Sequence, residues 1–281
     1  MAVITLRAGK NFCKQITFVI VVINASLAAF TSSINANPAL AVTLNVGNQY
    51  IQDFNGLSPS GTSLDKSTLP EGWNFLETGN NANSTYSTSD GSSNIGDIYS
   101  FGANGSFDRS LGSLTSTNLT SSIFGVNFTI ANATSPVDVT INYQGEQWRT
   151  GSRTAVDKLA FEYSTNATTL SDGNWTSFNA LDFTSPVTSG STNTPLVGNS
   201  PGNSVILAAT ISGLNLNNND NFSIRWIDTN VSGINGSDDA LAVNNVNVTA
   251  NPVPEPITMF GSLTALFFGA GLKKFRKKPQ A

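Results

Sequence analysis

The sequence predicts an all-β protein, an antiparallel β-sandwich or jelly roll, flanked by an N-terminal signal helix and a short C-terminal transmembrane helix. Three observations predict the sandwich. Apolar and polar residues alternate with a period of two in several segments, turn residues rich in Gly and Asn separate these segments, and the sequence has neither heptads nor long stretches of 3.6-residue period. Many short strands joined by polar turns are typical of two-layered antiparallel folds.

The first 41 residues have the pattern of a signal peptide. They carry three cations and no acid, and an apolar run at 16–30 is followed by small residues. Cleavage after Ala41 or after Ala36 fits the small residues there. The alternative is a retained membrane anchor, but a run of this length is shorter than the roughly 20 residues that cross a bilayer. We therefore expect export and removal of this segment by signal peptidase.

Residues 42–250 form the predicted β-sandwich domain. Alternation is clearest at 137–143, 159–163 and 222–227, where each segment is expected to bury one face and expose the other. Residues 205–211 are more uniformly apolar, which predicts a central strand.

The last strand of this domain is expected to contain a bulge. Within 241–248 the alternation changes phase at Asn244 and Asn245, as happens when one extra residue enters a strand. Two long polar stretches, 78–96 and 185–203, have little apolar area to bury, so we predict surface loops there.

Three unlike segments follow the domain. Residues 251–256 are a stiff, Pro-rich linker, residues 257–272 are uncharged and mostly apolar, and residues 273–281 are a basic tail. The apolar segment as a helix would be about 24 Å long, short of the ~30 Å hydrocarbon core, and its flanking lysines would extend the span. The basic tail is expected to stay cytoplasmic by the positive-inside rule.

This terminus resembles the PEP-CTERM sorting signal of bacterial surface proteins. The resemblance rests on Val253-Pro254-Glu255-Pro256, the short apolar segment and the closing basic cluster, in that order. It implies recognition by an exosortase, cleavage near the motif, and a protein that is held in the membrane transiently and then reaches the cell surface or the extracellular matrix. The alternative is a simple C-terminal anchor after a Pro-rich linker.

Charge and composition exclude several functions. The chain has a net charge of −4, and residues 42–252 carry six cations against 17 acids, so a nucleic-acid partner is not expected. The chain has no His, which excludes His-dependent triads and His-ligated metal sites. Its single cysteine, Cys13, cannot form a disulfide framework.

The segment 228–239 is rich in oxygen donors and tight-turn residues. Ca²⁺ prefers six to eight such oxygens, so Asp228, Asp238 and Asp239 are predicted ligands of a structural calcium ion, the one cofactor that the sequence suggests. The segment lacks the Glu that closes an EF-hand loop. The alternative, which we favour, is an Asx-rich turn that satisfies its own backbone.

Glu146, Trp148 and Arg149 form a second candidate site. A Trp ring stacks on the apolar face of a sugar, and charged groups beside it fix sugar hydroxyls, so these residues are possible saccharide contacts. The structural alternative, which we favour, is a strand end where Glu146 pairs with an arginine and Trp148 packs on the sandwich.

No motif in the sequence specifies a reaction. Among the carboxylates, Asp157 and Glu162 are five positions apart, which would place them on opposite faces of a strand and not as a catalytic pair. We therefore predict a non-enzymatic cell-surface or matrix protein, with extracellular polysaccharide as the candidate partner of its sandwich. The alternatives are a secreted glycan-cleaving enzyme and a purely structural surface protein.

Overall fold

The computed structural model describes residues 40–151, 156–189, 192–230 and 238–253. The predicted signal helix, transmembrane segment and basic tail lie outside these residues, as do Pro254, Glu255 and Pro256 of the sorting motif. Within the described part, no helix is long and apolar enough to cross a membrane.

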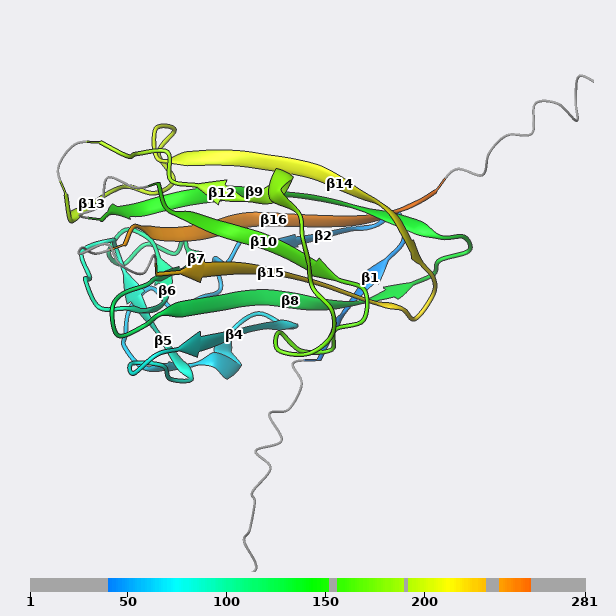
Figure 1. Cartoon of the computed structure of the whole chain (residues 1–281), viewed down its shortest axis with the longest axis horizontal. Helices are drawn as coiled ribbons and strands as arrows, with labels where there is room; N and C mark the ends of the chain where they lie inside the picture. Colours follow the sequence, from blue (N-terminus) through cyan, green and yellow to red (C-terminus); the bar gives the residue numbers. More distant parts are fainter. Residues whose placement is uncertain (1–39, 152–155, 190–191, 231–237, 254–281) are drawn as a thin grey trace, which may run out of the picture. The chain divides into compact units, whose positions relative to one another are not determined.

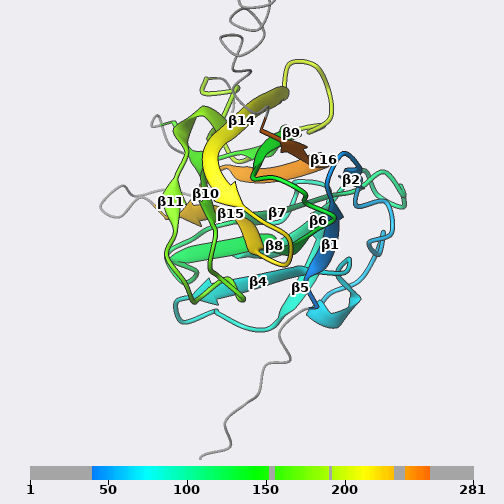
Figure 2. The same cartoon turned by 90° about the vertical axis from the view of Figure 1, so that its right-hand side faces the viewer.

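The described residues form two sheets, which Figure 1 shows from the side and Figure 2 from the end. Sheet A has the order β1-β8-β15-β10-β11, with β4 beside β8 and β12 beside β10. Its strands are β1 (Val42–Asn45), β4 (Trp73–Thr78), β8 (Ser121–Ala131), β10 (Lys158–Ser164), β11 (Thr176–Ser177), β12 (Phe183–Thr184) and β15 (Asn221–Thr229).

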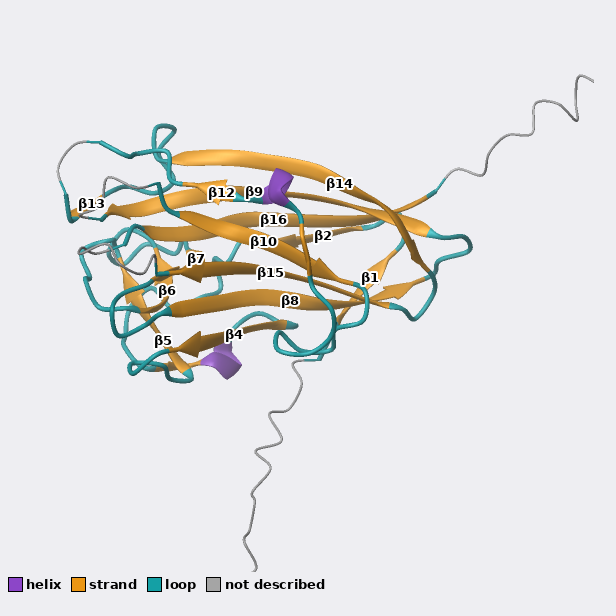
Figure 3. Ribbon diagram, viewed as in Figure 1, coloured by secondary structure: helices purple, strands orange, loops and turns teal. Residues whose placement is uncertain are grey.

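Sheet B has the order β13-β9-β16-β7-β6-β5-β3, with β14 beside β9 and β2 beside β16. Its strands are β2 (Gln49–Gln52), β3 (Leu64–Asp65), β5 (Thr85–Ser89), β6 (Asp97–Phe101), β7 (Ser110–Leu114), β9 (Val137–Thr150), β13 (Thr194–Pro195), β14 (Ser204–Leu216) and β16 (Ala240–Pro252). The helical turns η1 (Lys66–Thr68) and η2 (Asn179–Leu181) are the short purple segments in Figure 3.

The prediction of an all-β fold is confirmed at the level of two sheets. The described strand pairs are antiparallel except β1 with β8 and β5 with β6, which are parallel. The predicted strands at 137–143, 159–163 and 222–227 lie in β9, β10 and β15. Their alternating apolar residues point into one core between the sheets.

Trp226 joins the two sheets at the centre of this core. It is fully buried on β15 of sheet A and stacks on Trp73 and Phe124 from the same sheet. Its ring also meets Phe161 of β10 and Tyr143 of β9 edge to face, at centroid distances of 5.4 and 5.2 Å. Because Tyr143 belongs to sheet B, this indole fixes how the sheets face each other.

One predicted strand is formed, but its predicted position in the centre of a sheet is wrong. Residues 205–211 were expected to form a central strand, but they belong to β14, which pairs only with β9 among the described strands and leaves Ile206 78% exposed. Leu207 and Ala209 pack toward the core while Ala208 faces solvent. The apolar residues Ile206 and Ala208 on the solvent-exposed face had hidden the alternation of an edge strand.

The predicted bulge is confirmed, and both predicted loops are wrong in part, since the stretch 185–203 contains the two-residue strand β13, which pairs with β9. The register of β16 against β9 shifts between Asn244 and Asn247, and Asn245 has a left-handed φ of 49°. Asn tolerates this conformation better than most residues, which suits the bulge position. The polar stretch 78–96 contains β5 in addition to loops, since its hydroxyl-bearing residues pair with β6.

Replacing Trp226 by Ala is expected to lower the free energy of unfolding by about 3–5 kcal/mol, because it opens a cavity between the sheets. The matched control is Ile206→Ala, which removes a large apolar side chain from the exposed edge strand and should change stability by no more than ~0.5 kcal/mol. Urea unfolding of the full chain measures both. Equal effects would show that Trp226 does not hold the sheets together.

Candidate functional site

A polar pocket of about 310 Å³ is lined mostly by residues at the end of β5 or next to β5, β6 and β7. These strands lie at the left of Figure 1. It is lined by Pro59, by Thr88–Asp90 and Ser92–Ser93 at the end of β5, and by Gly102, Asn104 and Arg109 between β6 and β7. The lining therefore offers hydroxyls, an amide, a carboxylate and a guanidinium. These are the groups that hold polar ligands rather than apolar ones.

Arg109 is the unusual member of this lining because its side chain is 1% exposed. Its Nε donates to Ser100 Oγ at 2.9 Å, its Nη1 donates to the carbonyl of Ala103 at 3.4 Å, and its Nη2 donates to the carbonyl of Ser100. All three acceptors are neutral. The ion pairs between described residues, Lys158 with Asp182 and Arg225 with Glu162, do not include Arg109.

Two N–H groups of Arg109 have no acceptor among the described residues. Each terminal nitrogen of a guanidinium carries two hydrogens, and one hydrogen on each is used. Burial lowers the pKa of Arg109, and the charges of Asp108 and Asp90 oppose that shift. The guanidinium stays charged at neutral pH because its ordinary pKa is far above it.

Asp90 supplies the pocket's carboxylate. Its Oδ1 accepts hydrogen bonds from Ser92 N at 3.0 Å and from Ser92 Oγ at 2.5 Å. These hydrogen bonds lower the pKa of Asp90, so it is ionised at neutral pH. Opposite it, Gly102 lets the arginine lie close to the backbone, since a Cβ there would meet Arg109 Nη1 at 2.4 Å.

Glu146, Trp148 and Arg149, the predicted saccharide contacts, lie inside the protein. Trp148 is 4% exposed and stacks on Phe101 with ring centroids 6.0 Å apart, so its faces are covered. Its Nε1 donates to Glu146 Oε2 at 2.9 Å, and Asn244 Nδ2 donates to Glu146 Oε1 at 3.1 Å. Packing of Trp148 agrees with the structural alternative, although Glu146 is bound by an indole and an amide instead of an arginine.

Two of these buried residues contact the loop that forms one wall of the pocket. Arg149 Nη1 donates to the carbonyl of Gly91 at 3.1 Å, which fastens the loop that carries Asp90 and Ser92. A Cβ on Gly91 would come within 1.9 Å of the Trp148 carbonyl, so only glycine allows this approach. Trp148 and Arg149, with Glu146 bonded to the indole, thus affect the pocket by positioning the loop that forms one of its walls.

The predicted calcium ligands lie in a buried group of carboxylates at the strand ends. Thr115 Oγ1 donates to Asp238 Oδ2 at 2.6 Å and to Asp228 Oδ1 at 3.3 Å, which joins the end of β15 to the start of β16. Asp239 accepts from Ser185 Oγ and from Gly151 N, each at 2.5 Å.

Asp157, which the sequence did not assign to this group, is its fourth carboxylate. The amide of Asp239 donates to Asp157 Oδ2 at 3.2 Å. Desolvation, followed by the charges of Asp228, Asp238 and Asp239, raises the pKa of Asp157 to about 9. Desolvation also raises the pKa of Asp228 to about 7, against a hydrogen bond from Ser113. The pairing of β10 with β15, which aligns Leu159 with Asp228, brings Asp157 close to Asp228, and the hydrogen bond from the Asp239 amide brings it close to the start of β16.

No group of three metal-binding side chains is gathered closely enough to hold an ion within the residues that the structure describes. Residues 231–237, which the calcium hypothesis also uses, lie outside them. The calcium site therefore stays a prediction.

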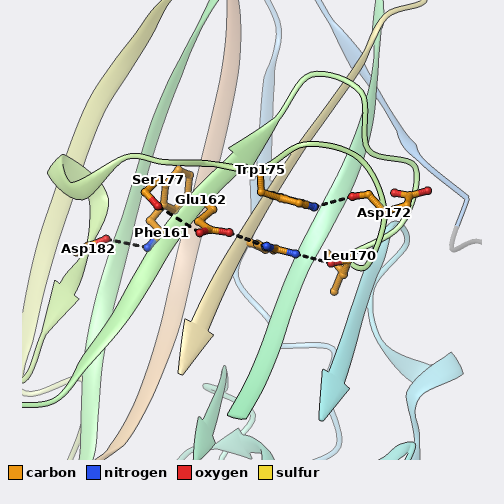
Figure 4. A network of polar contacts seen from close by, with 8 residues as sticks. Phe161, Glu162, Leu170, Asp172, Trp175, Ser177 and Asp182 are labelled. Atoms are coloured by element: carbon orange, nitrogen blue, oxygen red, sulfur yellow. Dashed lines mark hydrogen bonds and ion pairs between the residues drawn. The ribbon is translucent and has the colours of Figure 1, made fainter. Parts of the chain in front are cut away.

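A third polar network covers the outer face of sheet A (Figure 4). Arg225 donates to Glu162 Oε2 from Nε at 3.0 Å and from Nη2 at 2.7 Å, and its Nη1 donates to the carbonyl of Leu170 at 2.6 Å. The ring of Trp175 lies 3.9 Å from the guanidinium carbon, and its Nε1 donates to the carbonyl of Asp172. These groups satisfy one another, so the network fastens the loop between β10 and β11.

No family model matches the chain, and no curated protein matches it. Among solved structures it is similar to the K2 cleaved adhesin domain of Lys-gingipain, with 14% identity over 72% of this chain and 97% of that chain and a TM-score of 0.37. It is similar to the CBM22-1 xylan-binding domain from Paenibacillus barcinonensis Xyn10C, with 11% identity over 75% and 99% and a TM-score of 0.36.

The enzymatically active domain of bacteriophage CBA120 tailspike protein 4 is also similar, with 12% identity and a TM-score of 0.34. That match covers 70% of this chain and 21% of the tailspike chain. None of these similarities assigns an activity to this chain.

The free energy of unfolding is expected to fall as the pH rises from about 4 to about 9 when calcium is removed with EDTA. Asp157 and Asp228 hold protons in the native state over much of this range, whereas unfolded Asp titrates near 3.8. Stability that is fully present below about pH 4 is therefore lost with rising pH, at most ~1.4 kcal/mol per pH unit for each carboxyl. Urea unfolding across this range measures the slope, and a free energy that rises with pH would contradict it.

Calcium is expected to flatten that slope, because a bound cation stabilises ionised carboxylates. A few millimolar Ca²⁺ should raise the melting temperature near neutral pH, and a hundredfold excess over the dissociation constant adds about 2.7 kcal/mol. The double variant Asp238→Ala, Asp239→Ala should lose this gain. Identical melting curves in Ca²⁺ and EDTA would leave the Asx-rich turn as the correct interpretation.

Proposed function

We propose that the protein is an exported, non-enzymatic surface or matrix protein whose sandwich domain binds extracellular polysaccharide in the Arg109 pocket. The observation that carries this proposal is a buried guanidinium, with two N–H groups that no described residue accepts, at a pocket lined by hydroxyl, amide and carboxylate groups. Sugar hydroxyls both donate and accept hydrogen bonds, so they match a lining that offers both kinds of partner.

An exposed aromatic ring adjoins this pocket along the chain. Phe107 is 69% exposed and belongs to the loop that supplies Asn104 and Arg109. An aromatic ring offers a sugar an apolar surface, while charge-assisted hydrogen bonds from Arg109 and to Asp90 fix the orientation of its hydroxyls.

Binding without cleavage is favoured by the carboxylates of the pocket. Glycoside hydrolysis uses a pair of carboxyl groups that flank the scissile bond. Among the described residues that line the pocket, Asp90 is the only carboxylate. A secreted glycan-cleaving enzyme and a purely structural surface protein are the alternatives that the binding experiment below separates.

The proposed route to the surface uses the two termini. The signal-like start and the PEP-CTERM-like end support export, recognition by an exosortase, and a transient anchor formed by residues 257–272. The linker was predicted at 251–256, but residues 251 and 252 belong to β16, so only the Pro-rich segment after Pro252 would hold the cleavage region away from the sandwich.

Protein isolated from its host is expected to lack both the signal peptide and the basic tail, because both ends are predicted to be cleaved during export and sorting. Intact mass spectrometry measures this. A native protein that retains residues 257–281 would contradict sorting by an exosortase and would favour a permanent C-terminal anchor.

The same protein is expected to bind exopolysaccharide from its host without releasing new reducing ends. Replacing Phe107 by Ala should weaken binding roughly 2- to 10-fold, since a ring contact contributes about 0.5–1.5 kcal/mol. The matched control is Ile51→Ala, which removes an apolar side chain that is 60% exposed on β2 and should leave affinity unchanged.

Affinity electrophoresis measures the binding, and a reducing-sugar assay measures cleavage. Release of reducing ends would establish the enzyme. Neither binding nor release would leave the structural role.

A further inference from the structure

We propose that the sugar bound in this pocket is acidic, and that its carboxylate or sulfate group pairs with the two N–H groups of Arg109 that no described residue accepts. This inference rests on the proposed function, because it names the class of polysaccharide that the same pocket takes. It adds a requirement that a neutral polysaccharide does not meet.

The first argument is the cost of a buried charge. Moving a guanidinium out of water is expensive unless an anion or a full set of acceptors compensates for it. Arg109 is 1% exposed, yet its described hydrogen bonds all go to neutral oxygens of Ser100 and Ala103. Its charge is therefore compensated less than its burial requires.

Arg225 shows how the same fold compensates an arginine that has no ligand to bind. It donates twice to the carboxylate of Glu162 and once to a backbone carbonyl, and the ring of Trp175 covers its face. Arg109 has neither a carboxylate hydrogen bond nor an aromatic cover among the described contacts. Asp108 and Asp90 act on Arg109 through their charges, but the guanidinium has no carboxylate hydrogen-bonded to it, which is the difference between the two sites.

The second argument is geometric. Arg109 retains one N–H on Nη1 and one on Nη2, and the terminal nitrogens of a guanidinium form a planar fork that fits two oxygens of one acid group. The two nearby carboxylates make no hydrogen bond to Arg109, and one oxygen of each bonds to another residue. Asp108 Oδ2 accepts from Asn199 at 2.7 Å, and Asp90 Oδ1 accepts from Ser92.

Asp90 limits how much negative charge the pocket takes. It is ionised and lines the same pocket as Arg109, so a second anionic group on the ligand would be repelled. A hydroxyl beside the acid group would instead donate to Asp90. The pair therefore selects a sugar that carries one acid group and neighbouring hydroxyls.

The charge of the domain makes this inference easy to test. Residues 42–252 carry six cations and 17 acids, a net charge of −11. A polyanion is therefore repelled by the domain as a whole, and nonspecific attraction cannot imitate binding. Affinity for an acidic polymer must therefore come from local contacts, and the carboxyl-reduced and desulfated forms separate the contribution of Arg109 from that of contacts with neutral groups.

The experiment uses protein from its host and three forms of the host's exopolysaccharide: native, carboxyl-reduced, and desulfated. Carboxyl reduction converts each carboxylate into a neutral alcohol, while desulfation removes sulfate and leaves carboxylates in place. We expect at least a tenfold loss of affinity for one of the two modified forms, which identifies the acid group. Intact affinity for both modified forms would overturn the inference and leave the proposed function standing, whereas no binding to the native form would overturn the proposed function itself.

Variants assign the effect to Arg109. Arg109→Lys keeps the charge but loses the fork, and should weaken binding to the native polymer at least tenfold. The control Lys66→Gln removes a partly buried cation that lies outside the pocket, and it should leave affinity unchanged. An Arg109→Lys protein that folds, as shown by its circular dichroism, and binds with full affinity would overturn the inference.

Asp90→Asn keeps the test decisive if the arginine variant fails to fold. Asp90 is exposed, so this variant is expected to fold. Asn still accepts a hydroxyl hydrogen bond, although a weaker one, and this loss affects both polymers. Removing the negative charge relieves repulsion only for the native polymer, so affinity for the native polymer should rise several-fold relative to affinity for the form that lacks the acid group. Equal effects on both polymers would show that the ligand's charge is not recognised.

Discussion

The antiparallel pairing of β9 with β16 is the constraint on which the rest of the structure depends. It runs from Val137 paired with Pro252 to Arg149 paired with Ala240, so it extends along nearly the full length of both strands. The bulge at Asn244 and Asn245 lies within it and changes which residues face the core. Through this ladder the C-terminal strand is fixed against the middle of the chain.

The same ladder sets the positions of the polar sites. Near its end, β9 presents Trp148 and Arg149 to the loop of Gly91, which holds Asp90 at the pocket. β16 begins directly after Asp238 and Asp239, which places these carboxylates beside Asp157. The fold thus buries charge in two ways. It gives Arg225 a carboxylate partner. It leaves Arg109 at a pocket, where a ligand must balance its charge, and it leaves several carboxylates buried at the strand ends, where protons or a ligand must balance theirs.

Local patterns in the sequence predicted local features well. The alternation around Tyr143, Phe161 and Trp226 identified three strands of the core, because a strand with one buried face has a period of two. The phase change at Asn244 identified the bulge for the same reason. The pattern failed for β14, where Ile206 and Ala208 on the solvent-exposed face concealed an edge strand.

The sequence by itself determined the two-sheet, all-β character of the domain and an exclusion of His-dependent chemistry, because periodicity and composition are properties of short segments. Only the tertiary structure decided where the site lies. Trp148 could have been a sugar contact or a packed core residue, and its burial agrees with the second, which the sequence favoured. Arg109 and Asp90 looked ordinary among many polar residues, yet they line a pocket. Burial and the pairing of distant strands decide whether a side chain reaches a ligand, and both depend on long-range contacts that no local spacing encodes.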